Sequence, residues 1–394
     1  MDAKSIFLNH LAQTSPHPLA IAVDYASGSY IYDQSGKKYL DLISGIAVSN
    51  IGHSHPAIIK AVKEQAEKYM HVMAYGEFIQ APQNKLAKKL ADLLPEVLDS
   101  SYFVNSGAEA NEGALKLAKR ITGRTEIVAF KKSYHGSTHG ALSVSGNEVK
   151  KNAFRPLLPD VKFLEFNNPD DLVGITERTA AVIIEPIQGD AGVRIADQNY
   201  LNSLRNRCTE VGAQLIFDEI QTGFGRTGKL FAFEHYGVTP DILTIAKAFG
   251  GGMPIGAFIS SKPKMNSLTH NPMLGHITTF GGHPVNCAAA LANIEVIQND
   301  RLIDRVESKG KLLEELIAHP GIKEIRRKGL MFAIEFETAD LVQKIVKRCI
   351  ENGVIAFWFL SCPESFRLAP PINISDEDIR EGARIIHEAI STCC

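Results

Sequence analysis

The stretch QLIFDEIQTG at residues 214–223 is a short apolar run that stops at a carboxylate, Asp218. Between about residues 55 and 290 the chain repeats this pattern of helix and then short apolar strand. Such an alternation is typical of a largely parallel sheet covered on both faces. The apolar runs lie at 102–104, 127–130, 181–184, 214–217, 242–245 and 257–259. The sequence therefore predicts an α/β fold with a mainly parallel central sheet.

The two ends of the chain show different patterns. Residues 29–33 and 38–42 are alternating runs separated by a QSGK turn, which predicts a hairpin. After a long amphipathic stretch near 285–318, a smaller α+β domain is indicated by strand, helix and strand patterns at 330–336, 339–352 and 354–357. We therefore expect an N-terminal segment that packs with the small domain, a large ligand-binding domain and a C-terminal small domain, at 1–55, 56–290 and 291–394.

Composition excludes several classes of partner. The chain of 394 residues has 42 Lys and Arg against 44 Asp and Glu, and it contains no run of five or more basic residues. We therefore expect no nucleic-acid or membrane partner. No window has the roughly 18 consecutive apolar residues of a membrane span, and the first residues lead to no signal-peptide core, so we expect a cytoplasmic protein. Six cysteines without metal-ligand spacing predict reduced, mostly buried thiols and no metal site.

The first candidate motif is FVNSGAEAN at residues 103–111. Ligands of open parallel sheets bind beyond the carboxyl ends of the strands, and this motif follows a predicted strand and leads into a helix. Ser106, Gly107 and Ala108 would present a hydroxyl and backbone N–H groups at the helix start, where unsatisfied donors and the helix dipole favour a phosphate. A plain helix cap is the alternative.

Two charged residues follow neighbouring predicted strands. Asp218 ends its strand where a ligand would sit, and a buried carboxylate there needs a donor such as a protonated heterocyclic nitrogen. A metal ligand or a helix cap is the alternative. Lys247 follows an apolar strand and precedes the glycines at 250–252. Desolvation would lower its pKa, so that the neutral amine acts as a nucleophile or base, whereas a surface lysine is the alternative.

A phosphate site, a buried carboxylate and a lysine at strand ends are together the groups needed to hold pyridoxal phosphate (PLP). With these motifs the sequence resembles the class III (subgroup II) PLP-dependent aminotransferases, especially the acetylornithine and ornithine aminotransferases. The resemblance covers almost the whole chain. It rests on GHSHP at 52–56, NSGAEAN at 105–111, EPIQG at 185–189, DEIQTGFGRTG at 218–228, Lys247 with its glycines, and TTFGGHP at 278–284. It implies PLP fold type I, with the cofactor in the large domain.

The resemblance implies a role for each residue that would surround the cofactor. Lys247 forms the Schiff base and moves the proton between substrate and cofactor, while Asp218 keeps the pyridine nitrogen protonated. Gln221 bonds the phenolic oxygen, and Glu185 is a pocket glutamate beside it. Tyr134 and Ile220 cover the two ring faces, His135 lines the site, and Thr279 reaches the phosphate of the neighbouring subunit. A homodimer with shared active sites is therefore implied.

The substrate residues match the family less closely. Arg367 matches the arginine that binds the α-carboxylate of glutamate or 2-oxoglutarate, a group suited to bidentate guanidinium contacts. Asp190 stands where the family has a glutamate that pairs with this arginine, and its shorter side chain has less reach. Ser137 stands where the acetylornithine and ornithine enzymes carry an arginine for the donor carboxylate. The absence of this arginine removes a charge-assisted contact worth roughly 1.5–3 kcal/mol. Arg194 or another basic residue is the candidate substitute.

The sequence thus predicts a PLP-dependent aminotransferase that moves an amino group from an ornithine-like donor, N-acetylornithine or ornithine, to 2-oxoglutarate. The alternative is a GABA-type ω-amino acid or an amine as donor, because Ser137 disfavours acetylornithine. An aminomutase, which needs no keto-acid acceptor, and a non-catalytic PLP-binding protein are more remote. The presence of Lys247, Asp218 and Gln221 opposes the last of these.

Overall fold

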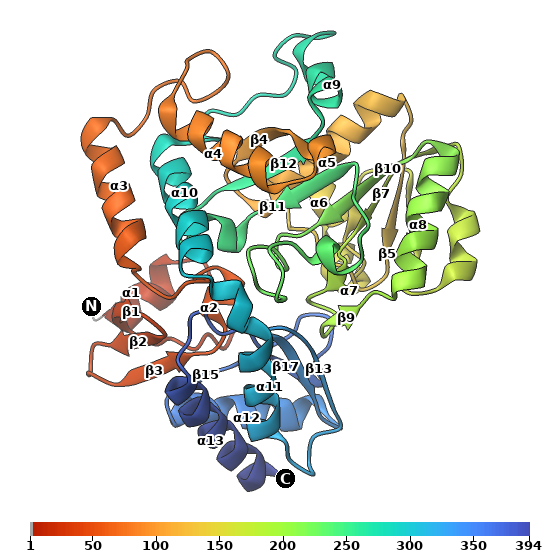
Figure 1. Ribbon diagram of the computed structural model, residues 1–394. Coiled ribbons are helices and arrows are strands. Elements are labelled where there is room, and N and C mark those ends of the chain that lie inside the picture. The colour runs from red at the N-terminus through yellow and green to blue at the C-terminus, as the bar shows by residue number, and fades with distance from the viewer. Residues whose placement is uncertain (1–2) are drawn as a thin grey trace.

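The computed structural model describes residues 3–394 and is built around a seven-stranded sheet (Figure 1). The strand order is β4-β12-β11-β10-β7-β5-β6, in which β12 runs antiparallel to β11 and β4, while the other neighbouring pairs are parallel. The strands are β4 Ser100–Val104, β5 Glu126–Phe130, β6 Val161–Leu164, β7 Thr179–Ile184, β10 Gln214–Asp218, β11 Ile242–Ile245 and β12 Gly256–Ser260. The mainly parallel α/β sheet predicted from the sequence is confirmed.

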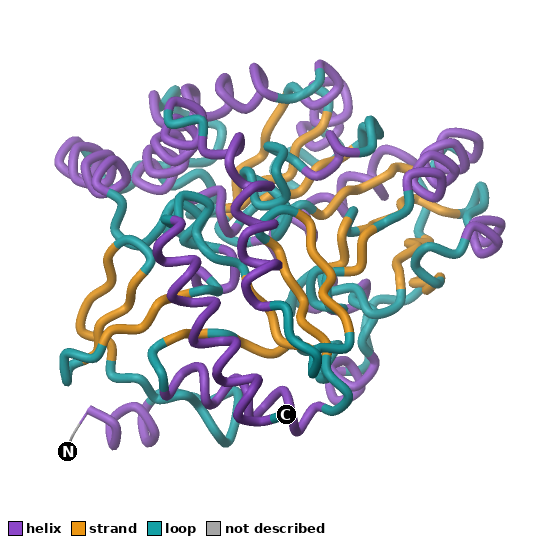
Figure 2. Tube along the Cα trace, turned by 60° about the horizontal axis from the view of Figure 1, so that its bottom comes forward, coloured by secondary structure: helices purple, strands orange, loops and turns teal. Residues whose placement is uncertain are grey.

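Both faces of this sheet are covered by helices (Figure 2). Along β10, Ile216 joins the core under α5 (Gly107–Thr122), whereas its neighbours Leu215 and Phe217 join the core that includes α8 (Gln198–Val211). Successive side chains of a strand point to opposite faces, so a strand between two helix layers must be apolar at every position. This requirement explains the continuous apolar runs that predicted these strands.

Three further helices form a packed group that reaches the central sheet at β4. Helix α10 (Pro284–Asn299) packs against α3 (Pro56–Lys68) and α4 (Ala81–Leu93). The predicted amphipathic stretch near 285–318 is in fact divided between α10, a short 3-10 turn and α11 (Val306–Ile317). The remaining helices are α1 Ala3–His10, α2 Ser44–Ala47, α6 His139–Val144, α7 Glu148–Lys151, α9 Lys262–Met265, α12 Ala339–Glu351 and α13 Asp376–Cys393.

The N-terminal strands form a sheet together with a strand from the far end of the chain. The predicted hairpin is present as β2 (Tyr30–Asp33) and β3 (Lys38–Asp41), with β1 (Val23–Ser27) on its outer edge. On the other edge, β15 (Val354–Ile355) pairs in parallel with β3. In Figure 1 the red N-terminal strands accordingly lie beside the blue C-terminal region.

The C-terminal region has its own antiparallel sheet of order β13-β14-β17-β16. Its strands are β13 Glu324–Lys328, β14 Met331–Glu335, β16 Phe357–Trp358 and β17 Ser365–Leu368. The single strand predicted at 354–357 is therefore two short strands in two different sheets, because the chain leaves β3 at Ile355 and joins β17 at Phe357. The domain boundaries at 55/56 and 290/291 stay a prediction.

A buried arginine connects these parts. The Arg226 side chain is fully buried, and it donates hydrogen bonds to the carbonyl oxygens of Leu330 and Pro370 and, at 2.8 Å, to Asn50 Oδ1. Burial lowers the pKa of Arg226 to about 9. One side chain of the large domain thus bonds to the N-terminal segment and to two loops of the C-terminal region.

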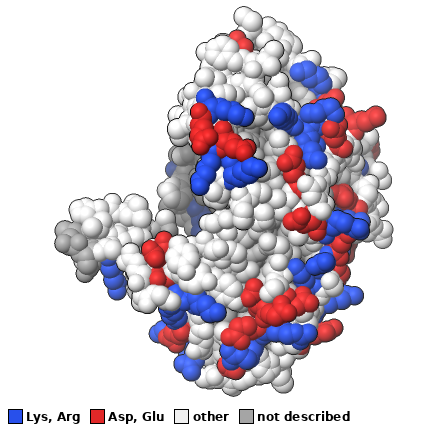
Figure 3. Space-filling model, turned by 60° about the vertical axis from the view of Figure 1, so that its left-hand side comes forward, with Lys and Arg blue, Asp and Glu red and all other residues white. Residues whose placement is uncertain are grey.

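The surface carries charges of both signs. On the face shown in Figure 3, basic and acidic side chains are interspersed, and the N-terminal segment projects from the body of the molecule. Within residues 3–394 no helix combines the length and apolar character needed to cross a membrane. Four of the six cysteines are buried, as predicted, whereas Cys393 is partly buried and Cys394 is exposed.

We predict that Arg226→Met destabilises the protein. The substitution leaves two buried carbonyl groups and a buried amide without their donor, which costs about 2–4 kcal/mol and lowers the thermal midpoint by several degrees. Differential scanning calorimetry of the variant measures this. The control is Arg178→Met, because Arg178 is exposed. Equal midpoints for the two variants would contradict the connecting role of Arg226.

Candidate active site

A cavity of about 540 Å³ lies at the carboxyl ends of the parallel strands. Each of β4, β5, β7, β10 and β11 is followed by residues that line this cavity. The structure thereby brings together most of the predicted site residues, which are Ser106, Gly107, Ala108, Tyr134, His135, Ser137, Glu185, Asp190, Asp218, Ile220, Gln221 and Lys247. Arg367 and Thr279 are outside this lining.

The start of α5 forms one wall. Ser106 is the N-cap, its hydroxyl accepts a hydrogen bond from the Glu109 N–H at 3.2 Å, and the Glu109 carboxylate accepts from the Asn105 N–H at 2.6 Å. The N–H groups of Gly107 and Ala108, which the helix itself cannot satisfy, lie at the cavity. A Cβ on Gly107 would come within 2.8 Å of the Ile220 side chain, which would then have to shift, so the glycine lets Ile220 pack closely against this wall. The geometry is that of an anion site.

Asp218 is held by three donors. It is 4% exposed, and its Oδ2 accepts a hydrogen bond from Asn111 Nδ2 at 2.8 Å and lies 2.7 Å from Nδ1 of His135. Its Oδ1 accepts from the N–H of Ile220 at 3.0 Å. Asn111 is itself fixed because its Oδ1 accepts from Thr244 on β11 at 2.8 Å. These donors fix the carboxylate in place, and within residues 3–394 no lysine or arginine forms an ion pair with it.

Two observations on residues near Asp218 indicate where a polar ligand fits. Within residues 3–394 the buried Nε2 of His135 has no hydrogen-bond partner. Buried polar atoms are normally bonded, so a ligand atom is the expected partner. Gly189 makes room for Gln221, because a Cβ at Gly189 would overlap the Gln221 amide. The amide of Gln221 thus lines the cavity close to the strand ends.

Lys247 follows β11 after one residue, Ala246, and is the first residue of a short 3-10 turn. Its φ of 47° lies in the left-handed region, which costs energy for a residue with a side chain and marks a position fixed by its surroundings. Burial lowers the pKa of the Lys247 ammonium, and Arg367 acts in the same direction, against the opposing charge of Asp218. A larger share of neutral amine is the chemical consequence.

Glu185 follows β7 and is 6% exposed. Its two carboxyl oxygens accept hydrogen bonds from the N–H groups of Tyr134, at 3.1 Å, and Gly189, at 3.0 Å. Burial raises the pKa of Glu185 to about 7, although the charge of His135 acts against this shift. The group can therefore exchange a proton near neutral pH.

Arg367 on β17 lies behind the cavity and is paired with Asp190. Its Nη2 lies 2.7 Å from Asp190 Oδ1, and its guanidinium stacks over the Phe359 ring at 4.4 Å. Asp190 also accepts from the Leu360 N–H and the Ser361 hydroxyl, both at 3.2 Å. The shorter aspartate does reach the arginine, since the loop around 360 supports it. Arg367 Nε is buried and has no partner within residues 3–394.

Three further residues named in the sequence analysis, Ser137, Arg194 and Thr279, take different positions relative to the cavity. Ser137 is exposed at the cavity mouth, and its Oγ lies 3.4 Å from the hydroxyl of Tyr134. Arg194, the candidate substitute for the missing arginine, is outside the residues that line the cavity. Thr279 is exposed and lies outside the cavity of its own chain, with its carbonyl oxygen 3.1 Å from His71 Nε2.

Comparison with known proteins assigns the family. The family model of class-III aminotransferases matches residues 11–390. The chain belongs to the class-III aminotransferases. Acetylornithine aminotransferases of Methanocaldococcus jannaschii and Bacillus subtilis are 43% and 39% identical, over 92% and 94% of this chain and 91% and 95% of their own. A [LysW]-aminoadipate semialdehyde/glutamate semialdehyde transaminase of Sulfurisphaera tokodaii is 42% identical, over 92% of this chain and 93% of its own.

Solved structures agree with this assignment. A transaminase from the marine bacterium Virgibacillus has a TM-score of 0.92 at 28% identity, with 99% of this chain and 98% of that chain covered. The ornithine aminotransferase of Toxoplasma gondii, described with PLP at its active site, has a TM-score of 0.90 at 29% identity, with 98% and 93% covered. This class-III aminotransferase is therefore a PLP-dependent transaminase of fold type I.

The residues of this class-III aminotransferase fit the cofactor. A phosphate suits the α5 start, a protonated ring nitrogen suits Asp218, and the cavity is lined by an amine, Lys247, of lowered pKa. Sequence reasoning missed Asn111, which donates to Asp218. Asn111 could have been recognised as a candidate from its position one turn after Gly107, on the side of the helix that faces the sheet.

We predict a pH-dependent effect of Glu185→Gln on the stability of this class-III aminotransferase. In the folded protein the pKa of Glu185 is about 7, against 4.5 ordinarily, so the folded state binds the proton more tightly. Wild-type stability therefore falls as the pH rises through this window. The variant lacks that loss, and its stability relative to wild type should increase by at most about 3 kcal/mol. Thermal midpoints across the window measure this, and a constant difference would contradict it.

Proposed function

We propose that this aminotransferase transfers the terminal amino group of an ornithine-like donor, N-acetylornithine or ornithine, to 2-oxoglutarate. The observation that carries the proposal is the buried Arg367–Asp190 pair beside the cavity, since a guanidinium there suits the carboxylate of a 2-oxo acid or of glutamate. The acetylornithine aminotransferases among the relatives support the donor class. In this proposal Asp190 releases Arg367 when the acceptor binds.

Each residue of the site has a proposed task. When bound, PLP supplies an electron sink for the carbanion that forms on the substrate. Asp218 holds a proton on the ring nitrogen, with Asn111 and His135 fixing its carboxylate. Lys247 would hold the cofactor through its side-chain amine, and because its pKa is lowered, that amine would also serve as the base that moves the proton. The α5 start with Ser106, Gly107 and Ala108 binds the phosphate.

The remaining cofactor contacts orient the ring. Tyr134 and Ile220 cover its faces, which contributes roughly 1 kcal/mol and mainly fixes the ring plane. Gln221 binds the phenolic oxygen, and Glu185 holds the Tyr134 backbone in place. Free, mostly buried thiols suit a reducing cytoplasm as the location of the protein.

A second donor class is favoured by one specific observation. Ser137 stands at the cavity mouth where an arginine for the donor carboxylate is expected, so a GABA-type ω-amino acid or an amine is the alternative donor. Donors of both classes would react at the same cofactor site. They differ in the part of the donor molecule that extends past Tyr134, away from the transferred amine.

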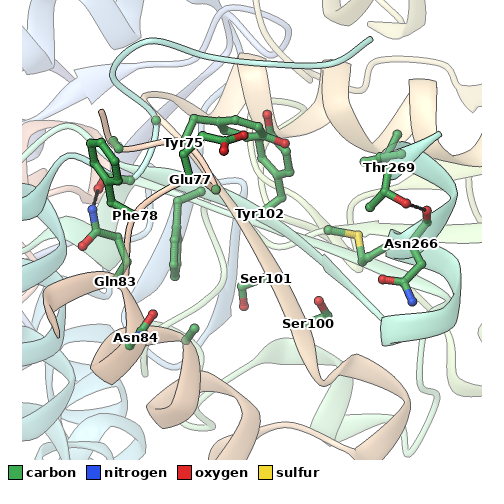
Figure 4. Close-up of a pocket in the computed structure, with 18 of the residues that line it drawn as sticks. Tyr75, Glu77, Phe78, Gln83, Asn84, Ser100, Ser101, Tyr102, Asn266 and Thr269 are labelled. Atoms are coloured by element: carbon green, nitrogen blue, oxygen red, sulfur yellow. Dashed lines mark hydrogen bonds between the residues drawn. The ribbon is translucent and has the colours of Figure 1, made fainter. Parts of the chain in front are cut away.

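We further propose a homodimer in which Thr279 reaches the phosphate of the partner. The chain exposes the large apolar side chains of Ile79, at 94%, and Met273, at 77%. They border a cavity of about 780 Å³ between α4, β4 and the 266–282 loop, and Figure 4 shows Phe78 and Tyr102 on one side of it and Thr269 on the other. An apolar surface of this kind suits a second copy of the chain.

The dimer is tested with Ile79→Glu. A charge on the apolar surface should shift the sedimentation coefficient from dimer to monomer and lower PLP affinity, because Thr279 is then absent from the partner's site. The matched control is Val173→Glu, since Val173 is also exposed, at 77%, and lies in the separate η3 turn (Pro169–Gly174). A wild-type monomer that is fully active would contradict the proposal.

The donor is tested by adding N-acetylornithine, ornithine, GABA and glutamate separately to the PLP-loaded enzyme. We predict that glutamate and an ornithine-like donor convert the visible absorbance to that of the pyridoxamine form.

Lys247→Ala should abolish turnover, and with it the absorbance of the lysine-bound cofactor, while circular dichroism stays unchanged. An active Lys247→Ala enzyme would overturn the catalytic assignment, and conversion by GABA but not by N-acetylornithine would select the alternative donor.

A further inference from the structure

A second cavity of about 300 Å³ adjoins the cofactor cavity. Tyr134, Ser137 and Asp190 line both cavities, so these residues form the boundary between them. At this boundary the Tyr134 hydroxyl lies 3.4 Å from Ser137 Oγ. An arginine at 137 would add a long side chain at the boundary, whereas serine leaves the two cavities in contact.

Most polar groups of the second cavity already have partners within the protein. Asn147 donates to Ser361 Oγ at 2.9 Å, and Ser361 donates to Asp190. Ser145 Oγ accepts from the His135 N–H at 2.9 Å and donates to the Ala141 carbonyl at 2.9 Å. These bonds fix the wall and leave little polar capacity there for a ligand.

Lys150 is different. It lies on α7, lines the cavity, and forms no ion pair with any of the described residues, 3–394, whereas its neighbour Lys151 pairs with Glu148. Asp190 is the one carboxylate in the lining, and it is paired with Arg367. Lys150 is exposed, so its ammonium is a solvent-accessible positive charge on the lining of this cavity, to which the His139 imidazole also belongs.

The rest of the wall suits a short aliphatic chain. Leu142, Phe154 and Leu360 line the cavity, and Phe154 and Leu360 are 58% and 44% exposed. A ligand that enters here past Tyr134 would bury these side chains against its methylene groups. An apolar wall with the exposed Lys150 ammonium on its lining is complementary to an alkyl chain that ends in a carboxylate.

We propose that the end of the amino donor remote from the transferred amine extends past Ser137 into this second cavity, where the Lys150 ammonium binds its carboxylate. Lys150 thereby replaces the charge that an arginine at 137 would supply, at a greater distance from Lys247. The inference rests on the proposed function, because it concerns the donor of that reaction. It makes Lys150 a specificity-determining residue with no part in the chemistry at the cofactor.

The test compares donors with and without the carboxylate on wild type, Lys150→Ala and the control Lys344→Ala, an exposed lysine on α12. The donor pairs are N-acetylornithine with N-acetyl-1,4-diaminobutane, and GABA with 1-aminopropane. In Lys150→Ala the KM of the carboxylate donor should rise about tenfold or more, with kcat nearly unchanged. The KM of the matched amine and the glutamate half-reaction should stay as in wild type.

Each outcome decides the question. If wild type does not prefer the carboxylate donors, or if Lys150→Ala keeps that preference, the inference is wrong while the aminotransferase assignment stands. The same holds if glutamate is converted but neither carboxylate donor is. If glutamate itself is not converted, the proposed function fails. In a Ser137→Arg background the arginine should take the carboxylate, so Lys150→Ala should then change KM little; an undiminished effect would contradict the shared role.

Discussion

The burial of one carboxylate, Asp218, is the constraint on which the site depends. A charged group at 4% exposure is costly unless donors surround it, and they come from three parts of the fold. Helix α5 contributes Asn111, the loop after β5 contributes His135, and the Asp218 turn itself contributes the N–H of Ile220. None of these donors is a lysine or arginine, so the carboxylate remains able to attract one more positive group. The sheet therefore holds a binding determinant for a cationic ring nitrogen before any ligand arrives.

The charges of Arg367 and Asp190, beside the cavity, are also balanced within the protein. Arg367 and Asp190 neutralise each other, and the loop at 360 and 361 holds the aspartate from behind. A ligand carboxylate can compete for Arg367 only by displacing a partner that keeps two other hydrogen bonds. Asp190 can thus give up the arginine without becoming an unsatisfied buried charge, which favours alternate binding of two substrates at one site.

The sequence predicted best the strands that are buried on both faces of the sheet. Continuous apolar runs located β5, β7, β10 and β11, because strands between two helix layers are apolar at every position. Two edge strands escaped prediction, because VKFL in β6 and EIRRK in β13 carry charges that solvent tolerates at the border of a sheet, whereas the more apolar edge strand β4 was predicted. The run at 354–357 was predicted as one strand, since nothing local records that its two halves pair with different sheets. Site residues at strand ends could be predicted because the continuous apolar runs locate the strands and therefore their ends. Asn111 could not be assigned in this way, because the sequence does not tell which face of its helix meets Asp218.

The parallel pairing of β3 with β15 has a consequence for how the protein is made. Leu40 is opposite Val354, so one edge of the N-terminal sheet stays open until the ribosome has delivered nearly the entire polypeptide. The hydrogen bonds of Arg226 to the carbonyl groups of Leu330 and Pro370 likewise cannot form until those residues have been synthesised. Nascent chains halted before residue 354 should therefore expose an unpaired strand edge and be natural clients for chaperones, whereas the central sheet can assemble earlier during synthesis.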